Sequence, residues 1–220
     1  MTPPAEPNSR PAPPLLAKVV FHPLFWIAAL AAVVAVPAVR HLRAESAGPP
    51  PPVLGTLPPF TLTSQGGEPF GAETLKGRVW VANFIFTRCP TICPPFTRKM
   101  ARLQERARPL SNVHLVSFSV DPGYDTPQVL TEYAALHGAD AARWTFLTGD
   151  ESVIKSTVVD GLKVMLGREG PADDLNSIFH GTHFVLVDAE LKIRGYYASD
   201  DDEAVERLFR DLRTLSAATR

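Results

Sequence analysis

The chain has 220 residues, of which 22 are prolines and two are cysteines, and its formal net charge is −1. The balanced charge argues against a basic surface for nucleic acid, and two cysteines exclude a disulfide scaffold or a four-thiolate zinc site. Fourteen prolines lie in the first 59 residues, so a proline-rich N-terminal third precedes a segment of ordinary composition that is long enough to bury one core.

The N-terminal third divides into three predicted segments. Residues 1–18 are rich in proline and alanine and lack hydrophobic periodicity, which predicts a disordered tail. Residues 19–39 carry no charged side chain other than a histidine, and a helix of that length, about 30 Å, predicts a transmembrane span. A cleaved signal peptide is the alternative, although its apolar region is usually shorter. Residues 40–59 contain four consecutive prolines and predict an extended linker.

Residues 60–220 alternate strand and helix patterns and predict one folded domain. The expected strands are residues 60–63, 68–70, 78–87, 113–120, 144–147, 183–188 and 192–197. The expected helices are residues 95–108, 126–137, 151–162 and 201–215. This alternation, which ends in a hairpin and a helix, predicts the α/β class with a mixed sheet flanked by helices.

Both cysteines follow the most apolar strand, residues 78–87. Cys89 and Cys93 are bracketed by three prolines, and Pro94 disfavours the helical conformation at the residue before it. We therefore expect both thiols in the loop between this strand and a helix that starts at residue 95. Backbone N–H groups at a helix start favour a thiolate, so a lowered cysteine pKa is expected.

This pair of thiols allows three interpretations. The first is an inert pair of buried cysteines or a structural disulfide, and the second is a redox pair like the C-x-x-C of thioredoxins with one extra residue. The third is a soft-metal site, because two thiolates suit Cu(I). A histidine ligand would distinguish the metal site from the other two interpretations. His180 lies in a predicted loop and His183 begins the following strand, but by itself a loop histidine is more often a solvated surface residue.

Several motifs together resemble one known family. Residues 86–94 (FTRCPTICP) look like the thiol motif of the Sco/SenC family of membrane-anchored copper chaperones. Residues 120–127 (VDPGYDTP) and 144–149 (WTFLTG) are similar to other signatures of that family. The family's histidine precedes an apolar strand that ends in an aspartate eight residues after that histidine, and His180 and Asp188 keep this spacing. The ligand role therefore carries over to His180.

The resemblance covers residues 53 to 215 and implies a thioredoxin-like fold. It implies one copper ion bound by Cys89, Cys93 and His180, and delivery to the CuA centre in the copper-bearing subunit of cytochrome c oxidase. Other periplasmic copper chaperones or thiol reductants are the further implied partners. The family topology implies a single-pass protein of the inner (cytoplasmic) membrane with its C-terminal domain in the periplasm. Such a protein binds and transfers its metal and is not an enzyme.

Two other activities use the same thiols. A membrane-tethered thiol–disulfide oxidoreductase that reduces periplasmic protein cysteines would need Cys89 and Cys93 but not His180. A peroxidase of the peroxiredoxin type needs a threonine three residues before its reactive cysteine, where this chain has Phe86. His183 is expected to point away from His180, because residues an odd number apart on a strand face opposite sides.

The remaining conspicuous residues have structural interpretations. The loop 167–179, with two glycines and three acidic residues, is expected to be mobile and to carry His180 toward and away from the metal. The acidic run 200–203 is interpreted as a capping box that opens a helix, with Asp200 as the cap. Asp121 and Asp125 are interpreted as turn and pre-helix residues, with Asp121 close enough to the thiol loop to support a metal ligand.

Overall fold

The computed structural model describes residues 23–27, 30, 31, 33, 35, 48–89, 93–168 and 178–219. The chain divides into two compact units, residues 1–48 and residues 49–220. In the first unit, residues 23–27 are helical, and no helix among the described residues is both long enough and apolar enough to cross a bilayer. The predicted tail, and most of the predicted span 19–39, lie outside the described residues.

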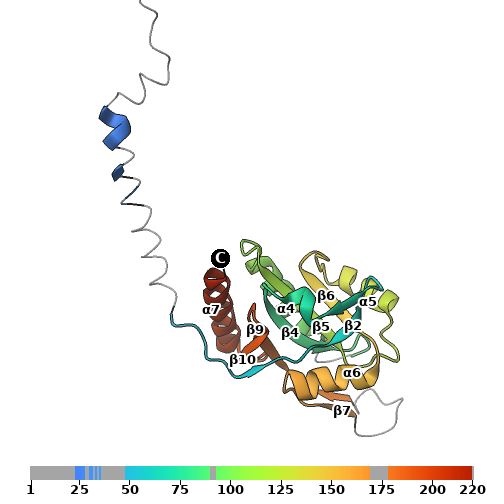
Figure 1. Cartoon of the computed structure of the whole chain (residues 1–220). Coiled ribbons are helices and arrows are strands. Elements are labelled where there is room, and N and C mark those ends of the chain that lie inside the picture. Colours follow the sequence, from blue (N-terminus) through green and yellow to red (C-terminus); the bar gives the residue numbers. More distant parts are fainter. Residues whose placement is uncertain are drawn as a thin grey trace, which may run out of the picture. The chain divides into compact units, whose positions relative to one another are not determined.

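The described part of the second unit is built on an eight-stranded mixed sheet with the order β1-β10-β9-β4-β5-β6-β2-β3 (Figure 1). Its strands are β1 (Gly55–Thr56), β2 (Thr61–Ser64), β3 (Pro69–Gly71), β4 (Val79–Ile85), β5 (Val113–Ser119), β6 (Trp144–Thr148), β9 (His183–Val187) and β10 (Lys192–Ala198). The central strands β4, β5 and β6 are parallel. Every residue of β4 and β5 is buried, as the apolar runs predict for strands covered on both faces.

Helices flank this sheet. They are α3 (Ala72–Leu75), α4 (Cys93–Arg106), α5 (Pro127–Leu136), α6 (Glu151–Lys155), the π-helical turn η1 (Ser156–Gly161) and α7 (Asp202–Ala218). α4 lies beside α7, and Arg106 of α4 forms an ion pair with Glu206 of α7 at 2.6 Å. It also lies beside α5, through a 2.8 Å hydrogen bond between Thr97 Oγ1 and Tyr133 Oη. The predicted mixed α/β sheet flanked by helices is confirmed.

Three helix boundaries differ from the sequence prediction. α4 begins at Cys93 and not at residue 95, because prolines are tolerated in the first turn, where their missing N–H would have no helical partner. The predicted helix 151–162 changes to π geometry after Lys155. The cap of α7 is Asp201, whose carboxylate accepts the Glu203 N–H at 2.8 Å, and not Asp200.

Two predicted non-regular segments contain short strands. The compact unit starts at Pro49, and the end of the predicted linker forms β1, which pairs with the edge strand β10. The predicted loop 167–179 is flanked by an antiparallel pair, β7 (Leu166–Arg168) and β8 (Ile178–His180). His180 is therefore the last residue of a short strand and not a loop residue, whereas residues 169–177 lie outside the described residues.

A buried hydrogen-bond chain crosses the three parallel strands. Trp144 Nε1 donates to Ser117 Oγ at 2.9 Å, and Ser117 Oγ donates to Asn83 Oδ1 at 2.6 Å. All three residues are fully buried. Ser117 therefore satisfies one buried donor and one buried acceptor at the same time.

Replacing Ser117 by alanine is expected to lower the free energy of unfolding by about 2 kcal/mol, because Trp144 and Asn83 each lose a buried partner. Urea denaturation measures this change. The matched control Ser111→Ala, at an exposed position, is expected to stay within about 0.5 kcal/mol. Equal effects of the two substitutions would contradict the stabilising role assigned to this hydrogen-bond chain.

Candidate metal centre

The topology brings the thiol segment and the 180–183 turn to one end of the sheet. β4 and β9 are antiparallel, and their register pairs Ala82 with Val185. The chain that leaves β4 toward Cys89 and the chain that enters β9 from His180 therefore emerge at the same edge. The backbone of His180 is paired with Leu166 of β7, and its side chain lies outside the described part of the structure.

The two cysteines lie next to each other at the start of α4. Both are thiols, and Cys89 is 8% exposed and Cys93 1% exposed. The Cys93 N–H donates to Cys89 Sγ at 3.3 Å, and the Cys89 N–H donates to the Phe86 carbonyl at 3.1 Å. The placement of both thiols where β4 meets α4 is thus close to the prediction.

The protonation state of Cys93 differs from the prediction. Burial raises the pKa of the Cys93 thiol, and a backbone hydrogen bond from Phe86 opposes this only in part. The hydrogen bond to the Cys89 side chain raises the pKa further. The expectation of a lowered pKa is wrong for Cys93, because removal from water outweighs the helix N-terminus. The Cys93 thiol is therefore neutral near neutral pH.

A fully buried carboxylate supports the segment before Cys89. Asp125 accepts the Thr87 N–H at 3.2 Å, the Thr87 hydroxyl at 2.6 Å and the Ser119 hydroxyl at 2.6 Å. Burial raises the pKa of Asp125, and these hydrogen bonds act in the opposite direction. Its residue type and position predicted only a turn or pre-helix role for Asp125. The available signal was its place between the buried strand β5 and the cap of α5.

Arg88, next to Cys89, is held by two neighbours. Its guanidinium forms an ion pair with Asp121 at 2.6 Å and lies over the Tyr124 ring, 4.1 Å from the centroid. The hydrogen bond to Asp121 raises the pKa of Arg88. The predicted proximity of Asp121 to the thiol segment is therefore correct, and the contact is made through Arg88.

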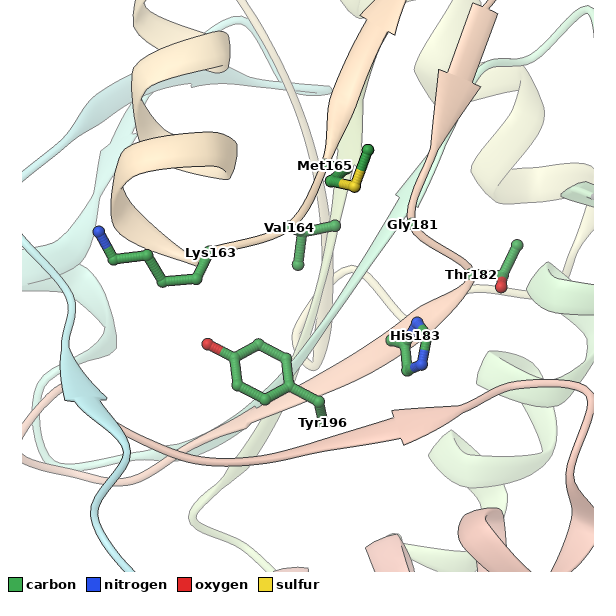
Figure 2. Close-up of a pocket in the computed structure, with 7 residues that line it drawn as sticks. All are labelled: Lys163, Val164, Met165, Gly181, Thr182, His183 and Tyr196. Atoms are coloured by element: carbon green, nitrogen blue, oxygen red, sulfur yellow. The ribbon is translucent and has the colours of Figure 1, made fainter.

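His183 lies at a hollow of about 540 Å³ beside the same edge (Figure 2). The other lining residues come from the η1–β7 connection, the 180–183 turn and β10: Lys163, Val164, Met165, Gly181, Thr182 and Tyr196. The next residue of β9, Phe184, packs on Phe96 of α4 with ring centroids 4.7 Å apart. Since neighbouring strand residues face opposite sides, His183 faces away from the helix that carries Cys93.

The described side chains do not by themselves complete a metal site. No three histidine, cysteine, aspartate or glutamate side chains in the described ranges are grouped so that they would hold a metal ion. The donor set among them is the pair of thiols, and thiolates are the ligands that soft metals such as Cu(I) prefer. The side chain of His180, the third ligand that the family resemblance implies, lies outside the described residues.

Comparison with known proteins identifies the family. The profile of the SCO1/SenC family matches residues 52–217. The chain belongs to the SCO1/SenC family. It is 34% identical over 167 residues to the SCO1 protein homolog of Bacillus subtilis, which covers 75% of this chain and 85% of the relative. It is 31% identical over 143 residues to protein SenC of Rhodobacter capsulatus, covering 64% of this chain and 63% of the relative.

Solved structures of SCO1/SenC proteins share the fold. A SCO1/SenC family lipoprotein from Bacillus anthracis has a TM-score of 0.66 at 36% identity, covering 73% of this chain and 95% of that one. BsSco, a Sco-family cytochrome c oxidase assembly protein with a disulfide switch, has a TM-score of 0.67 at 32% identity and covers 76% and 98%. Arabidopsis thaliana ScoI with copper bound has a TM-score of 0.61 at 26% identity and covers 72% and 98%. The fold is therefore the thioredoxin-like fold of the family.

Proposed function

We propose that this chain binds one copper ion through Cys89, Cys93 and His180 and delivers it to the CuA centre of cytochrome c oxidase. The observation that carries the proposal is the contact between the cysteines, in which the Cys93 N–H lies 3.3 Å from Cys89 Sγ. This contact keeps two soft donors together where β4 meets α4. The copper-bound ScoI relative and the sheet topology that brings His180 to the same edge support it.

The donor set fits Cu(I) as a cargo. Two thiolates and one imidazole are soft or intermediate ligands, and three donors leave a position open for exchange with an acceptor. Because the pKa of Cys93 is raised, the bound copper replaces a proton on that sulfur. The low exposure of both cysteines keeps water away from the sulfurs.

The cellular setting is part of the proposal. BsSco belongs to a family of cytochrome c oxidase assembly proteins and the Bacillus anthracis relative is a lipoprotein, which supports a membrane-attached role in oxidase assembly. We propose residues 19–39 as a transmembrane anchor and residues 1–18 as a cytoplasmic tail. The folded domain would then meet the copper-bearing subunit in the periplasm, with other copper chaperones or thiol reductants as further partners.

Thiol–disulfide exchange with periplasmic proteins is the second candidate function. The adjacent thiols support it, and so does the disulfide switch identified in the related protein BsSco. A three-coordinate copper site needs a third ligand, whereas thiol exchange does not. His180 therefore separates the two functions.

Anaerobic competition for Cu(I) against a chelator tests the copper proposal. The wild-type chain is expected to bind one copper, and His180→Ala is expected to lose at least about a hundredfold in affinity, the upper range for loss of a supporting group. His183→Ala is the matched control, three residues away in the same turn, and is expected to keep the wild-type affinity. An unchanged affinity in His180→Ala would rule out His180 as a ligand, and thiol exchange would then be favoured.

A further inference from the structure

We propose that Asp125 is a positioning residue that sets the relative placement of the two thiols. Asp125 acts through Thr87, and no contact between Asp125 and the metal is assigned. The copper arm of the proposal rests on the proposed function, whereas the thiol arm does not.

The carboxylate joins the ends of two neighbouring parallel strands. It accepts the hydroxyl of Ser119, the last residue of β5, and both the hydroxyl and the N–H of Thr87, two residues beyond β4. Asp125 is fully buried, so water does not compete for these bonds. A buried, hydrogen-bonded carboxylate of this kind is costly to disturb, because each lost bond leaves a buried donor unsatisfied.

Thr87 is connected to both cysteines through its neighbour Phe86. The Phe86 carbonyl accepts the Cys89 N–H at 3.1 Å, and the Phe86 backbone also hydrogen-bonds the Cys93 thiol. Both cysteines are therefore held against the peptide segment that Asp125 fixes at Thr87. A shift of this segment would move the two sulfurs relative to each other.

Asp125 is itself held rigidly. Its N–H donates to the Asp121 carbonyl at 2.9 Å. The next residue, Thr126, caps α5 by accepting the Val129 N–H at 3.3 Å, and Pro127 opens the helix. The carboxylate thus stands at the start of a regular helix, and supporting groups on such elements hold a site more precisely than groups on free loops.

A carboxylate suits this position better than an amide. Three donors converge on Asp125, and an ionised carboxylate only accepts, whereas an asparagine side chain presents one acceptor oxygen and an NH2 group that donates. Asp125→Asn keeps the shape but turns a donor toward at least one other donor. We expect the Thr87 segment to loosen and the thiols to lose their fixed spacing.

A matched control separates positioning from general stability. Asp188 is also a buried carboxylate, 3% exposed, that accepts the N–H groups of Glu190 and Lys192 at 3.0 and 2.8 Å. It lies in the turn between β9 and β10, at the opposite end of β9 from the 180–183 turn. Asp188→Asn is expected to lower the melting temperature without affecting the thiols.

The first measurement is the rate at which Cu(I) leaves the full chain for excess chelator. Asp125→Asn is expected to raise this rate about 10- to 100-fold, the range for loss of a group that orients a metal ligand. Asp188→Asn is expected to stay within about twofold of the wild type, because its contacts do not reach the thiols. Equal rates for Asp125→Asn and Asp188→Asn, or an unchanged rate in Asp125→Asn, would overturn the proposal.

The second measurement needs no copper. The thiols are equilibrated with oxidised dithiothreitol, so that Cys89 and Cys93 form one disulfide and lose two protons while their two electrons reduce dithiothreitol. Asp125→Asn is expected to shift this equilibrium toward the dithiol, because loosely held thiols have a lower effective concentration for each other. If the wild type bound no copper, the proposed function would fail while this arm would still test positioning.

Two substitutions at Thr87 keep the proposal testable if Asp125→Asn does not fold. Thr87→Val removes the hydroxyl bond to Asp125 but keeps the backbone bond, and a smaller change of the same sign is expected in both measurements. Thr87→Ser retains the hydroxyl and is expected to restore wild-type values. Failure of Thr87→Ser to differ from Thr87→Val would show that the hydroxyl–carboxylate contact does not act on the thiols.

Discussion

Replacing Cys93 by serine is expected to abolish tight Cu(I) binding. A hydroxyl is a hard oxygen donor that stays protonated near neutral pH, so it does not replace a thiolate as a ligand for a soft ion. The loss of a direct ligand is expected to lower the affinity by at least about a hundredfold, more than the loss of an outer group costs. Chelator competition under anaerobic conditions measures it, and Cys89→Ser is expected to behave in the same way.

The control for this experiment is Met165→Leu. Met165 is a soft sulfur donor that is 73% exposed and lines the hollow beside His183, so it tests whether any nearby sulfur would serve. The affinity of the Met165→Leu variant for Cu(I) is expected to equal that of the wild type. A Cys93→Ser variant that folds cooperatively and keeps its copper within tenfold of the wild type would disprove a two-thiolate site.

Lowering the pH from about 6.5 to 4 is expected to destabilise the domain through His114. This side chain is 3% exposed, lies between Arg78 Nη1 at 3.3 Å and Thr145 Oγ1 at 2.9 Å, and stacks on Phe70. Burial, with a smaller contribution from Arg78 and Arg143, lowers the pKa of His114 to about 4.

The direction of this change in stability follows from proton binding to His114 in the folded and unfolded states. The unfolded chain protonates His114 below about pH 6.5, whereas the folded chain does so only near pH 4. The free energy of unfolding therefore falls by about 3 kcal/mol across this range and is unaffected by His114 above it. Urea denaturation at several pH values measures this fall.

His114→Gln isolates the contribution of this histidine. Other carboxylates titrate in the same pH range, so the informative quantity is the difference in unfolding free energy between wild type and variant. The wild type is expected to lose about 3 kcal/mol relative to the variant between pH 7 and pH 4. A difference that does not change with pH would show that His114 does not control acid stability.

Much of the architecture was predictable because its causes are local. The long apolar runs of β4 and β5 predicted strands buried on both faces, and the Thr126–Pro127 pair predicted the start of α5 within one residue. The FTRCPTICP stretch predicted where the thiols lie. These features depend on side-chain polarity and on backbone restrictions of proline, which act over a few neighbouring residues.

Other local features were predicted only in part, because a tertiary contact overrode a local preference. The turn from Asp188 to Leu191 contains no glycine, and Leu191 adopts a positive φ of 61°. The Asp188 carboxylate stabilises this turn by accepting two backbone N–H groups and an ion pair with Arg194 at 2.7 Å. Leu191 is itself buried in the core, which offsets the backbone strain.

The sequence by itself determined the α/β class, the main strands along the chain and the place of the two thiols after the most apolar strand. Only the tertiary structure decided the protonation state of Cys93 and the contacts that support the thiol segment. Burial raises the pKa of Cys93 against the helix N-terminus, and Asp125 reaches Thr87 from 38 residues away along the chain. Desolvation and long-range hydrogen bonds depend on what the fold places around a group, and the neighbouring residues in the sequence do not specify them.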